Sequence, residues 1–489
     1  MNLAPLRLVL LLISLALACF ALSPQARAVC QQGCDSSLFN AFLGDDALIS
    51  NITGAGNTAL GWRALFTNTD ASFSTAVGGG ALALNNGTSN TAVGAAALLL
   101  NTSGTQNTAV GTDAMVHNDG GSNNNAVGNF ALFNNIDGVE NNAFGNSALV
   151  QSMHASFNTA IGDTALWSND VTGHGTANFN TAVGASALGL NIDASENTAV
   201  GYNALASNDV SGHGTANFNT AIGAEALSFN GDANSNTAVG FNALMNNDIA
   251  GNGLANQNTA IGYQALFSNT DGDSNTAVGF QALNDNATGI QNTAEGWSAG
   301  SNATGSGNVY IGADMRGFAG EDNHTYIRNI KDTNVSGGNA DSVTMDLTTG
   351  LLGHAASSRR YKEDVKPMDK ASETLYRLKP VTYRYKKEID STQSPAFGLI
   401  AEEVAEVNPD LVAHNAQGQP ESVHYQAVNA MLLNEFLKEH RKVEKLEATV
   451  AQQHQDFEAA IAQLKAQVQK VSTQLELRKS APQTVLNDH

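Results

Sequence analysis

Asn107-Thr108-Ala109-Val110-Gly111 is one copy of a motif that recurs along more than half of this 489-residue sequence. Most copies have Val or Ile before the Gly, and two variable residues, Ala-Leu and an Asn-rich turn after it. The motif glycines are Gly61, Gly78, Gly94, Gly111, Gly128, Gly145, Gly162, Gly184, Gly201, Gly223, Gly240, Gly262, Gly279, Gly296 and Gly312. Neighbouring glycines are 17 residues apart in most cases, 16 apart twice and 22 apart three times. A fixed period of this length predicts a solenoid, in which each repeat forms one coil and stacks on its neighbours.

Each unit is predicted to form short β-strands rather than helices. Thr and Val/Ile are β-branched, and Asn and Gly interrupt the chain before any helix-length segment develops. The Gly supplies a positive φ or a close approach of two backbones, and the Leu four residues later fills the core. At about 4.8 Å per coil, the fifteen coils would make a rod on the order of 70 Å long. Glu295 at the Val position and Gly300 at the Leu position mark the end of the array.

The three 22-residue units carry inserts of related sequence. These are Val171-Thr172-Gly173-His174-Gly175, Val210-Ser211-Gly212-His213-Gly214 and Ile249-Ala250-Gly251-Asn252-Gly253. Because the motif is intact on both sides, we expect the inserts to be loops on one face of the solenoid. Their two histidines are expected to be solvated loop residues.

The composition excludes some classes of partner. The formal net charge is −21 and the isoelectric point is about 4.7, so we expect no nucleic-acid partner, because phosphate binding needs a basic surface. Asp271-Gly272-Asp273 leaves calcium binding open, but no complete ligand loop is present. We therefore expect no metal site and no cofactor.

The N-terminus has the features of an export signal. Arg7 precedes the apolar run Leu8–Leu17, and Ala26-Arg27-Ala28 fits a cleavage site after Ala28. A lipoprotein signal at Cys19 is the alternative. The predicted signal peptide implies export, so the mature chain is expected in the periplasm, on the cell surface or secreted. No later segment is long and apolar enough to span a membrane.

Cys30 and Cys34 open the predicted mature chain. In an exported protein, two cysteines this close are expected to form a small disulfide loop. A metal site would need two further ligands, and none is nearby in the sequence.

The C-terminal segment has the spacing of a coiled coil. Its apolar seam contains Leu446, Val450, His454, Phe457, Ile461, Leu464, Val468, Val471 and Leu475. The steps of three and four residues form heptads with one extra four-residue step, a stutter near His454. The alternative is a single amphipathic helix packed on its own domain, but the length of the seam favours association, and three strands would match a trimeric rod.

These observations predict a mainly β fold, with a β-solenoid or β-roll rod and a C-terminal coiled coil. A trimeric state of both, and a small α+β domain between them, are implied by the resemblances described below. The predicted segments are a signal peptide (1–28), an N-terminal cap with the Cys pair (29–56), the repeat array (57–312), a β-rich neck (313–356), the small domain (357–430), the coiled coil (431–478) and a disordered tail (479–489).

Two parts of the sequence resemble known families. The repeats resemble the heads of trimeric autotransporter adhesins, which implies a homotrimeric rod with a surface or glycan ligand. From Ser357 the chain resembles the endosialidase-type intramolecular chaperone, a self-cleaving serine peptidase domain of phage tail fibres and spikes. The segments that carry this second resemblance are 357–364 (Ser-Ser-Arg-Arg-Tyr-Lys-Glu-Asp), 378–385 (Leu-Lys-Pro-Val-Thr-Tyr-Arg-Tyr), 398–404 (Gly-Leu-Ile-Ala-Glu-Glu-Val), 408–412 (Asn-Pro-Asp-Leu-Val) and 423–425 (Val-His-Tyr).

The second resemblance implies cleavage of the peptide bond between Ala356 and Ser357. Ser357 would be the nucleophile and Lys362 its general base. Ser358 stands where the family more often has Asp and is itself a candidate nucleophile. Arg359 and Arg360 are candidate cations that would lower the pKa of the lysine.

The function predicted from the sequence is that of an exported trimeric fibre. Its C-terminal domain would act as an intramolecular chaperone, set the trimer register and cut itself off in a single turnover. The alternative is an uncleaved structural or adhesive fibre that retains its trimerisation domain.

Overall fold

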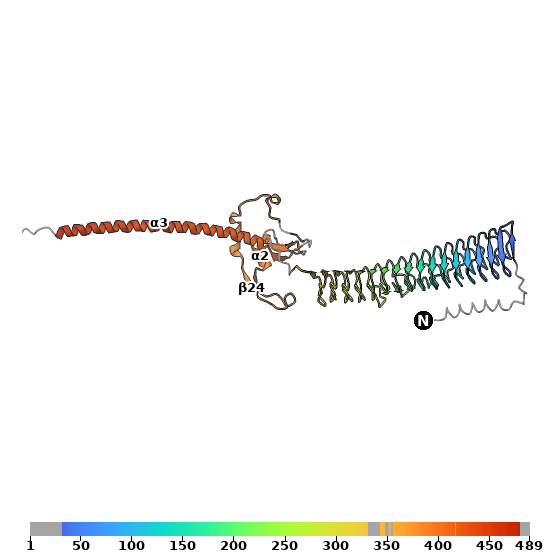
Figure 1. Ribbon diagram of the computed structural model, residues 1–489. Coiled ribbons are helices and arrows are strands. Elements are labelled where there is room, and N and C mark those ends of the chain that lie inside the picture. Colours follow the sequence, from blue (N-terminus) through green and yellow to red (C-terminus); the bar gives the residue numbers. More distant parts are fainter. Residues whose placement is uncertain (1–31, 331–342, 348–351, 354–355, 416, 480–489) are drawn as a thin grey trace, which may run out of the picture. The chain divides into compact units, whose positions relative to one another are not determined.

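The computed structural model describes residues 32–330, 343–347, 352–353, 356–415 and 417–479, and the chain divides into two units, Met1–Thr333 and Asn334–His489 (Figure 1). The predicted signal peptide with Cys19, the predicted disulfide partner Cys30 and the tail from residue 480 lie outside the described residues.

The first unit is a β-solenoid, as predicted, with short strands that stack coil upon coil (Figure 1). Its main sheet has 18 strands. Strand β1 is antiparallel to β2, and from β2 onward each strand of this sheet pairs parallel and in register with the next. The strands of the sheet are β1 (Gln32–Asp35), β2 (Asn40–Leu43), β3 (Thr58–Leu60), β4 (Thr75–Val77), β5 (Thr91–Val93), β6 (Thr108–Val110), β7 (Asn125–Val127), β8 (Asn142–Phe144), β9 (Thr159–Ile161), β10 (Thr181–Val183), β12 (Thr198–Val200), β14 (Thr220–Ile222), β16 (Thr237–Val239), β17 (Thr259–Ile261), β18 (Thr276–Val278), β19 (Thr293–Glu295), β20 (Val309–Ile311) and β21 (Thr325–Ile327). A second parallel sheet joins β11 (Leu190–Asn191), β13 (Ser207–Asn208) and β15 (Phe229–Gly231).

Alternation along each strand builds the core. In β6 the side chain of Ala109 is fully buried, whereas Val110 is 36% exposed. Successive side chains point to opposite faces of a strand, so the Ala column lies inside and the Val/Ile column outside. The Leu column, which includes Leu98, is fully buried beside the Ala column. From β3 to β19 the core is therefore one repeating layer of small and medium side chains.

The motif glycines cannot be replaced without strain. Gly145 has a φ of +147°, and a Cβ built on it would lie 2.3 Å from the carbonyl oxygen of Gly162 in the next coil. Both the backbone conformation and the contact therefore require Gly. Leu149, four residues later, is fully buried with a φ of +54°. A left-handed Leu costs about 1–2 kcal/mol, which burial of its side chain, at roughly 1.5–3 kcal/mol, offsets.

Two columns of buried Asn join the coils. In the first, the backbone N–H of Asn124 donates to Oδ1 of Asn107 at 3.0 Å, and Nδ2 of Asn107 donates to the carbonyl oxygen of Gly121 at 2.8 Å. In the second, Nδ2 of Asn118 donates to Oδ1 of Asn101 at 2.7 Å. Each amide thus satisfies polar groups of the turn that would otherwise be buried without partners.

The solenoid extends past both limits predicted for the array. At the N-terminal end, β2 already pairs with β3, and β1 lies against it, with Gly33 seated over the ring of Phe42. At the other end, β21 pairs with β20. The segment 313–356 is predicted as a separate β-rich neck, but within it Thr325–Ile327 keeps the alternation of the array and continues its sheet.

The last coils replace the Ala column with tyrosines. Tyr310 is fully buried and stacks on Tyr326 with ring centroids 5.6 Å apart. Gly300 stands where other coils have Leu, and a Cβ on it would lie 2.8 Å from the ring of Tyr310. The hydroxyls of Tyr310 and Tyr326 donate to the two carboxylate oxygens of Glu321. The predicted end signal at Gly300 thus marks a local change of core packing.

The second unit is a small α+β domain followed by a long helix. It contains β22 (Thr344–Met345), β23 (Leu352–Gly353), the 3-10 helices η1 (Arg359–Tyr361) and η2 (Asp369–Arg377), β24 (Val381–Tyr383), β25 (Ala396–Gly398), α2 (Ala401–Val407), the 3-10 helix η3 (Pro409–Leu411), β26 (Val412–His414), β27 (Pro420–Val423) and α3 (Tyr425–Lys479). The pairs β22–β23, β24–β25 and β26–β27 are antiparallel.

The core of this domain joins α2, η3, β26 and the first turns of α3. Its buried side chains are Val404, Leu411, Val412, Val428 and Met431. Helix α3 has 55 residues and continues far beyond this core. Among the described residues, no helix combines the length and apolar character needed to cross a membrane.

Candidate active site

The Ser and Lys singled out in the sequence lie next to each other. The backbone N–H of Tyr361 donates to the carbonyl oxygen of Ser358 at 3.0 Å, and that of Lys362 to Arg359 at 3.1 Å. These bonds form η1, a single turn. Across this turn, Nζ of Lys362 donates to Oγ of Ser357 at 3.0 Å.

The arrangement has the elements of a serine nucleophile with a lysine base. In the hydrogen bond as it stands, the ammonium donates to the hydroxyl oxygen. A neutral Lys362 in the same place would accept the hydroxyl proton and leave Oγ free to attack a carbonyl carbon. Ser357 directly follows Ala356, so the carbonyl of Ala356 is the carbonyl nearest to Oγ along the chain.

The neighbouring candidates have other contacts. The guanidinium of Arg360 lies 4.8 Å from the centre of the Tyr361 ring, a cation–π contact. Ser358, at the start of η1, makes no capping hydrogen bond with its side chain. The structure therefore brings Lys362 to Ser357, and it turns Arg360 to an aromatic ring.

Residues 356–362 are all exposed in the single chain. The hydrogen-bonded side chains of Ser357 and Lys362 are therefore in contact with solvent in one chain.

A second serine and lysine occur together at the junction of η2 and α3. Ser372 is fully buried, and its hydroxyl donates to Glu435. Nζ of Lys438 lies 2.7 Å from Oε1 of Glu435 and 3.5 Å from Oγ of Ser372, and the hydroxyl of Tyr376 donates to Oε2 of Glu435 at 2.7 Å. Because Glu435 binds both the serine proton and the lysine, this cluster fastens η2 to α3 and is unsuited to nucleophilic attack.

The electrostatics of this cluster agree with a structural role. Lys438, Ser372 and Tyr376 all donate to Glu435 and lower the pKa of its carboxyl to about 2. Sequence reasoning missed the cluster, because Ser372 and Glu435 are 63 positions apart and nothing local links them.

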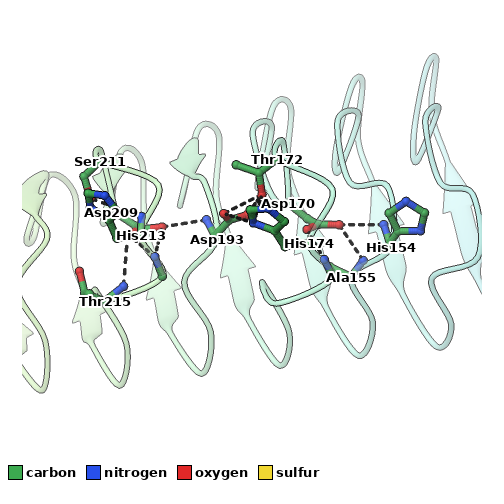
Figure 2. A network of polar contacts seen from close by, with 12 residues as sticks. His154, Ala155, Asp170, Thr172, His174, Asp193, Asp209, Ser211, His213 and Thr215 are labelled. Carbon is green, nitrogen blue, oxygen red and sulfur yellow. Dashed lines mark hydrogen bonds and ion pairs between the residues drawn. The ribbon is translucent and has the colours of Figure 1, made fainter.

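A buried carboxylate directly precedes each of the first two inserts of the solenoid (Figure 2). Oδ2 of Asp170 accepts from the backbone N–H of His154 at 2.7 Å, and its Oδ1 accepts from Gly175 at 2.7 Å. Asp209 bonds in the same way to the backbones of Asp193 and Gly214. Burial raises the pKa of Asp209 in spite of these donors. Each insert is therefore fastened to the preceding coil by one buried carboxylate.

The insert histidines differ from each other in their contacts. Nδ1 of His174 lies 3.3 Å from Oδ2 of Asp193, whereas His213 uses its backbone N–H, which donates to Oγ of Ser211 at 3.3 Å (Figure 2). In the described part of the chain, no group of three or more His, Cys, Asp or Glu residues is arranged to hold a metal ion. Cys34 on β1 is exposed and forms no disulfide with a described residue.

One comparison with known proteins gives a match. Residues 357–413 match the family model described as chaperone of endosialidase, Peptidase_S74. The match begins at the candidate nucleophile and ends in β26, so this stretch carries the chaperone domain that the sequence predicted. No curated protein matches the chain.

Proposed function

We propose that this chain forms a trimeric fibre whose C-terminal domain assembles the rod and then cuts itself off between Ala356 and Ser357. The observation that carries the cleavage is the 3.0 Å contact between Nζ of Lys362 and Oγ of Ser357 beside that bond. The match to the chaperone of endosialidase supports the chaperone role. The activity would be that of a serine peptidase acting once, on its own chain.

The cleavage would proceed in two steps. Lys362 takes the hydroxyl proton of Ser357, and Oγ attacks the carbonyl carbon of Ala356. The carbon–nitrogen bond then breaks, the proton passes to the leaving amine, and an ester joins Ala356 to Oγ. Water hydrolyses this ester, which leaves a carboxylate on Ala356 and restores the hydroxyl of Ser357 with a free amine.

The exposure of the dyad supports cleavage that depends on assembly. The lysine needs a lowered pKa, and in the single chain it is exposed. A neighbouring copy that covers η1 would supply the burial. The reaction would then follow trimer formation and leave the finished rod kinetically trapped.

Two apolar surfaces support association of several copies. The seam of α3 is exposed in one chain, with Leu446 65%, Phe457 67% and Leu475 55% accessible. The Val/Ile column of the solenoid is also partly exposed, with Ile161 at 43%. Surfaces of this length are typical of interfaces, and a parallel three-stranded coil would place equivalent columns of three rods at the same level.

Denaturing electrophoresis of the purified protein tests the cleavage. We expect a fragment of about 130 residues that begins at Ser357, and N-terminal sequencing identifies it. Ser357→Ala and Lys362→Met should leave the chain intact, because each removes one member of the dyad. Ser358→Ala is the matched control and should still be cut.

Two results would contradict this assignment. A wild-type chain that stays full length in the assembled protein would favour the alternative, a fibre that keeps its trimerisation domain. If Ser357→Ala is still cut and Ser358→Ala stays intact, the nucleophile is Ser358 and not Ser357. Crosslinking tests the trimer separately.

A further inference from the structure

Helix α3 contains one polar residue in an otherwise apolar part of its seam. From Leu446 to Leu475 the seam positions are apolar except at His454. Its neighbours in the seam are Val450 and Phe457, which are 57% and 67% exposed in the single chain. This inference rests on the proposed function, because only association of three α3 helices would bury these positions.

The spacing around His454 differs from that of the rest of the seam. The steps Leu446 to Val450 and Val450 to His454 are both four residues, and the step to Phe457 is three. The steps from Leu446 to Phe457 therefore add up to eleven residues, and a unit of this length locally unwinds a left-handed coiled coil. His454 is therefore a seam residue in a straighter part of the coil, with an apolar layer on either side.

Three imidazoles in such a layer would lack hydrogen-bond partners. A neutral imidazole has one donor nitrogen and one acceptor nitrogen, and the Val450 and Phe457 layers offer neither donors nor acceptors in their side chains. A divalent cation on the axis would bind one ring nitrogen from each chain at this level.

The charges near His454 permit a cation. On the same helix, Asp456 and Glu458 follow it, and Glu447 lies two turns before it, whereas the closest lysine on this side, Lys445, is nine residues away. Nε2 of Gln452 donates to Oδ1 of Asp456 at 2.9 Å, and both residues are exposed in one chain. The surroundings are thus acidic without a carboxylate in the layer itself.

We propose that three copies of His454 bind one divalent transition-metal ion on the axis of the coiled coil. Three imidazole nitrogens and one water are a ligand set that suits Zn²⁺, Co²⁺ or Ni²⁺, whereas Ca²⁺ and Mg²⁺ prefer oxygen. Each chain supplies one ligand, so the site exists only in the trimer. A bound ion would hold the three helices in register at this level.

The test uses full-length protein without a histidine tag, stripped with EDTA. Titration calorimetry with Zn²⁺ should give one ion per three chains, and Co²⁺ should produce a visible absorption band. Both signals should be lost in His454→Gln. The matched control is His440→Gln, which removes an imidazole outside the seam of the same helix, and it should bind as the wild type does.

A second variant separates binding from folding. His454→Leu should still form a trimer, because Leu suits an apolar seam, and Zn²⁺ should no longer raise its melting temperature. The metal site alone is ruled out if the protein is a trimer by sedimentation equilibrium but binds no ion, or if His454→Gln binds the ion equally well. His454 would then be a polar layer that only helps to set the register of the coil. A chain that stays monomeric overturns the trimer and this site with it.

Discussion

Ser152 occupies a position that Asn fills in the neighbouring coils. Nδ2 of Asn135 donates to Oδ1 of Asn118 at 2.6 Å, which continues the buried amide column. At the next coil the column stops, and within the described part of the chain neither Oδ1 of Asn135 nor Oγ of Ser152 has a hydrogen-bond partner. A buried acceptor without a donor costs free energy, so one residue makes this coil a weak point.

Ser152→Asn should therefore stabilise the solenoid. The new Nδ2 would donate to Oδ1 of Asn135, and we expect the free energy of unfolding to rise by about 1 kcal/mol. Denaturant unfolding followed by far-UV circular dichroism measures the change. Ser103→Asn, in an exposed turn, is the control and should have little effect. Unchanged or lower stability in Ser152→Asn would mean that the coil cannot accommodate the longer side chain.

The carboxyl of Glu435 predicts how the C-terminal domain responds to acid. Its pKa is lowered to about 2, mainly by Lys438 and then by Ser372 and Tyr376. A pKa below the ordinary value of the unfolded chain gives a stabilising contribution that is complete above about pH 4.5. This contribution is lost as the pH falls from there toward 2.

In Glu435→Gln, the stability of the domain should depend less on pH in this range, and it should be lower than in the wild type at neutral pH. The helical circular dichroism signal, followed in denaturant at several pH values, gives the comparison. Glu447→Gln, at an exposed site on the same helix, should keep the wild-type dependence. If Glu435→Gln does so as well, another carboxylate controls the acid response.

At the residue scale, the sequence predicted contacts that are local and missed those that are not. Ser357 and Lys362 are five residues apart, and a single turn joins them. The bond from Ser372 to Glu435 depends on how η2 packs on α3, which no local pattern encodes. The buried Asp170 was also missed, because an Asp in a loop is usually solvated and only the stacked neighbour supplies its donors.

At the scale of elements, the repeat period predicted the strands well. Thr-Ala-Val triplets form the sheet because they alternate and because each stacks on an identical neighbour. The limits were predicted less well, because β2 and β21 keep the alternation but change the residues. In β21, Tyr326 stands where most strands have Ala, and its ring stacks on that of Tyr310. The sequence does not show that Gly300 leaves the space that the ring of Tyr310 fills.

This pairing of a large and a small residue can be tested by exchange. Gly300→Leu alone should destabilise the last coils by several kcal/mol, because the new side chain overlaps the ring of Tyr310 in a packed core. Tyr310→Ala alone should cost about 3–5 kcal/mol through the cavity it leaves. The double variant restores the Leu and Ala of an ordinary coil and should be more stable than either single variant.

Limited proteolysis followed by mass spectrometry locates the effect of these variants. The single variants should be cut between residues 300 and 330, and the double variant should be protected again. Leu283→Val, in the coil before, is a mild core control. If the double variant loses as much stability as the two single variants together, the two positions act independently and the packing argument is wrong.

At the scale of the whole molecule, the chain divides after Thr333, which lies inside the segment predicted as the neck, residues 313–356. Sequence could not give the state of association, because a seam of apolar residues is compatible with one helix or with several. In one chain, α3 beyond Val443 is exposed on all sides.

The role of α3 in assembly gives the last prediction. Deleting residues 443–489 removes the seam and should leave chains that neither trimerise nor cut themselves. Three rods of nearly identical coils can pair in many registers, and a shift by one coil still matches Val/Ile to Val/Ile. A coil that joins the three C-termini raises their effective concentration and selects one register. Without it, the exposed Val/Ile column should lead to low soluble yield and mixed oligomers.

Sedimentation velocity and denaturing electrophoresis of the same samples separate the two effects. The control deletes only residues 480–489, which follow the seam, and it should assemble and be cut as the full chain is. A truncated chain that is uncut and heterogeneous agrees with a dyad that acts only when a neighbouring copy covers it. A truncated chain that forms uniform trimers would show that the rod sets its own register. Cleavage of a truncated monomer would show that the exposed Ser357–Lys362 pair is sufficient, and the link between assembly and cutting would then fail.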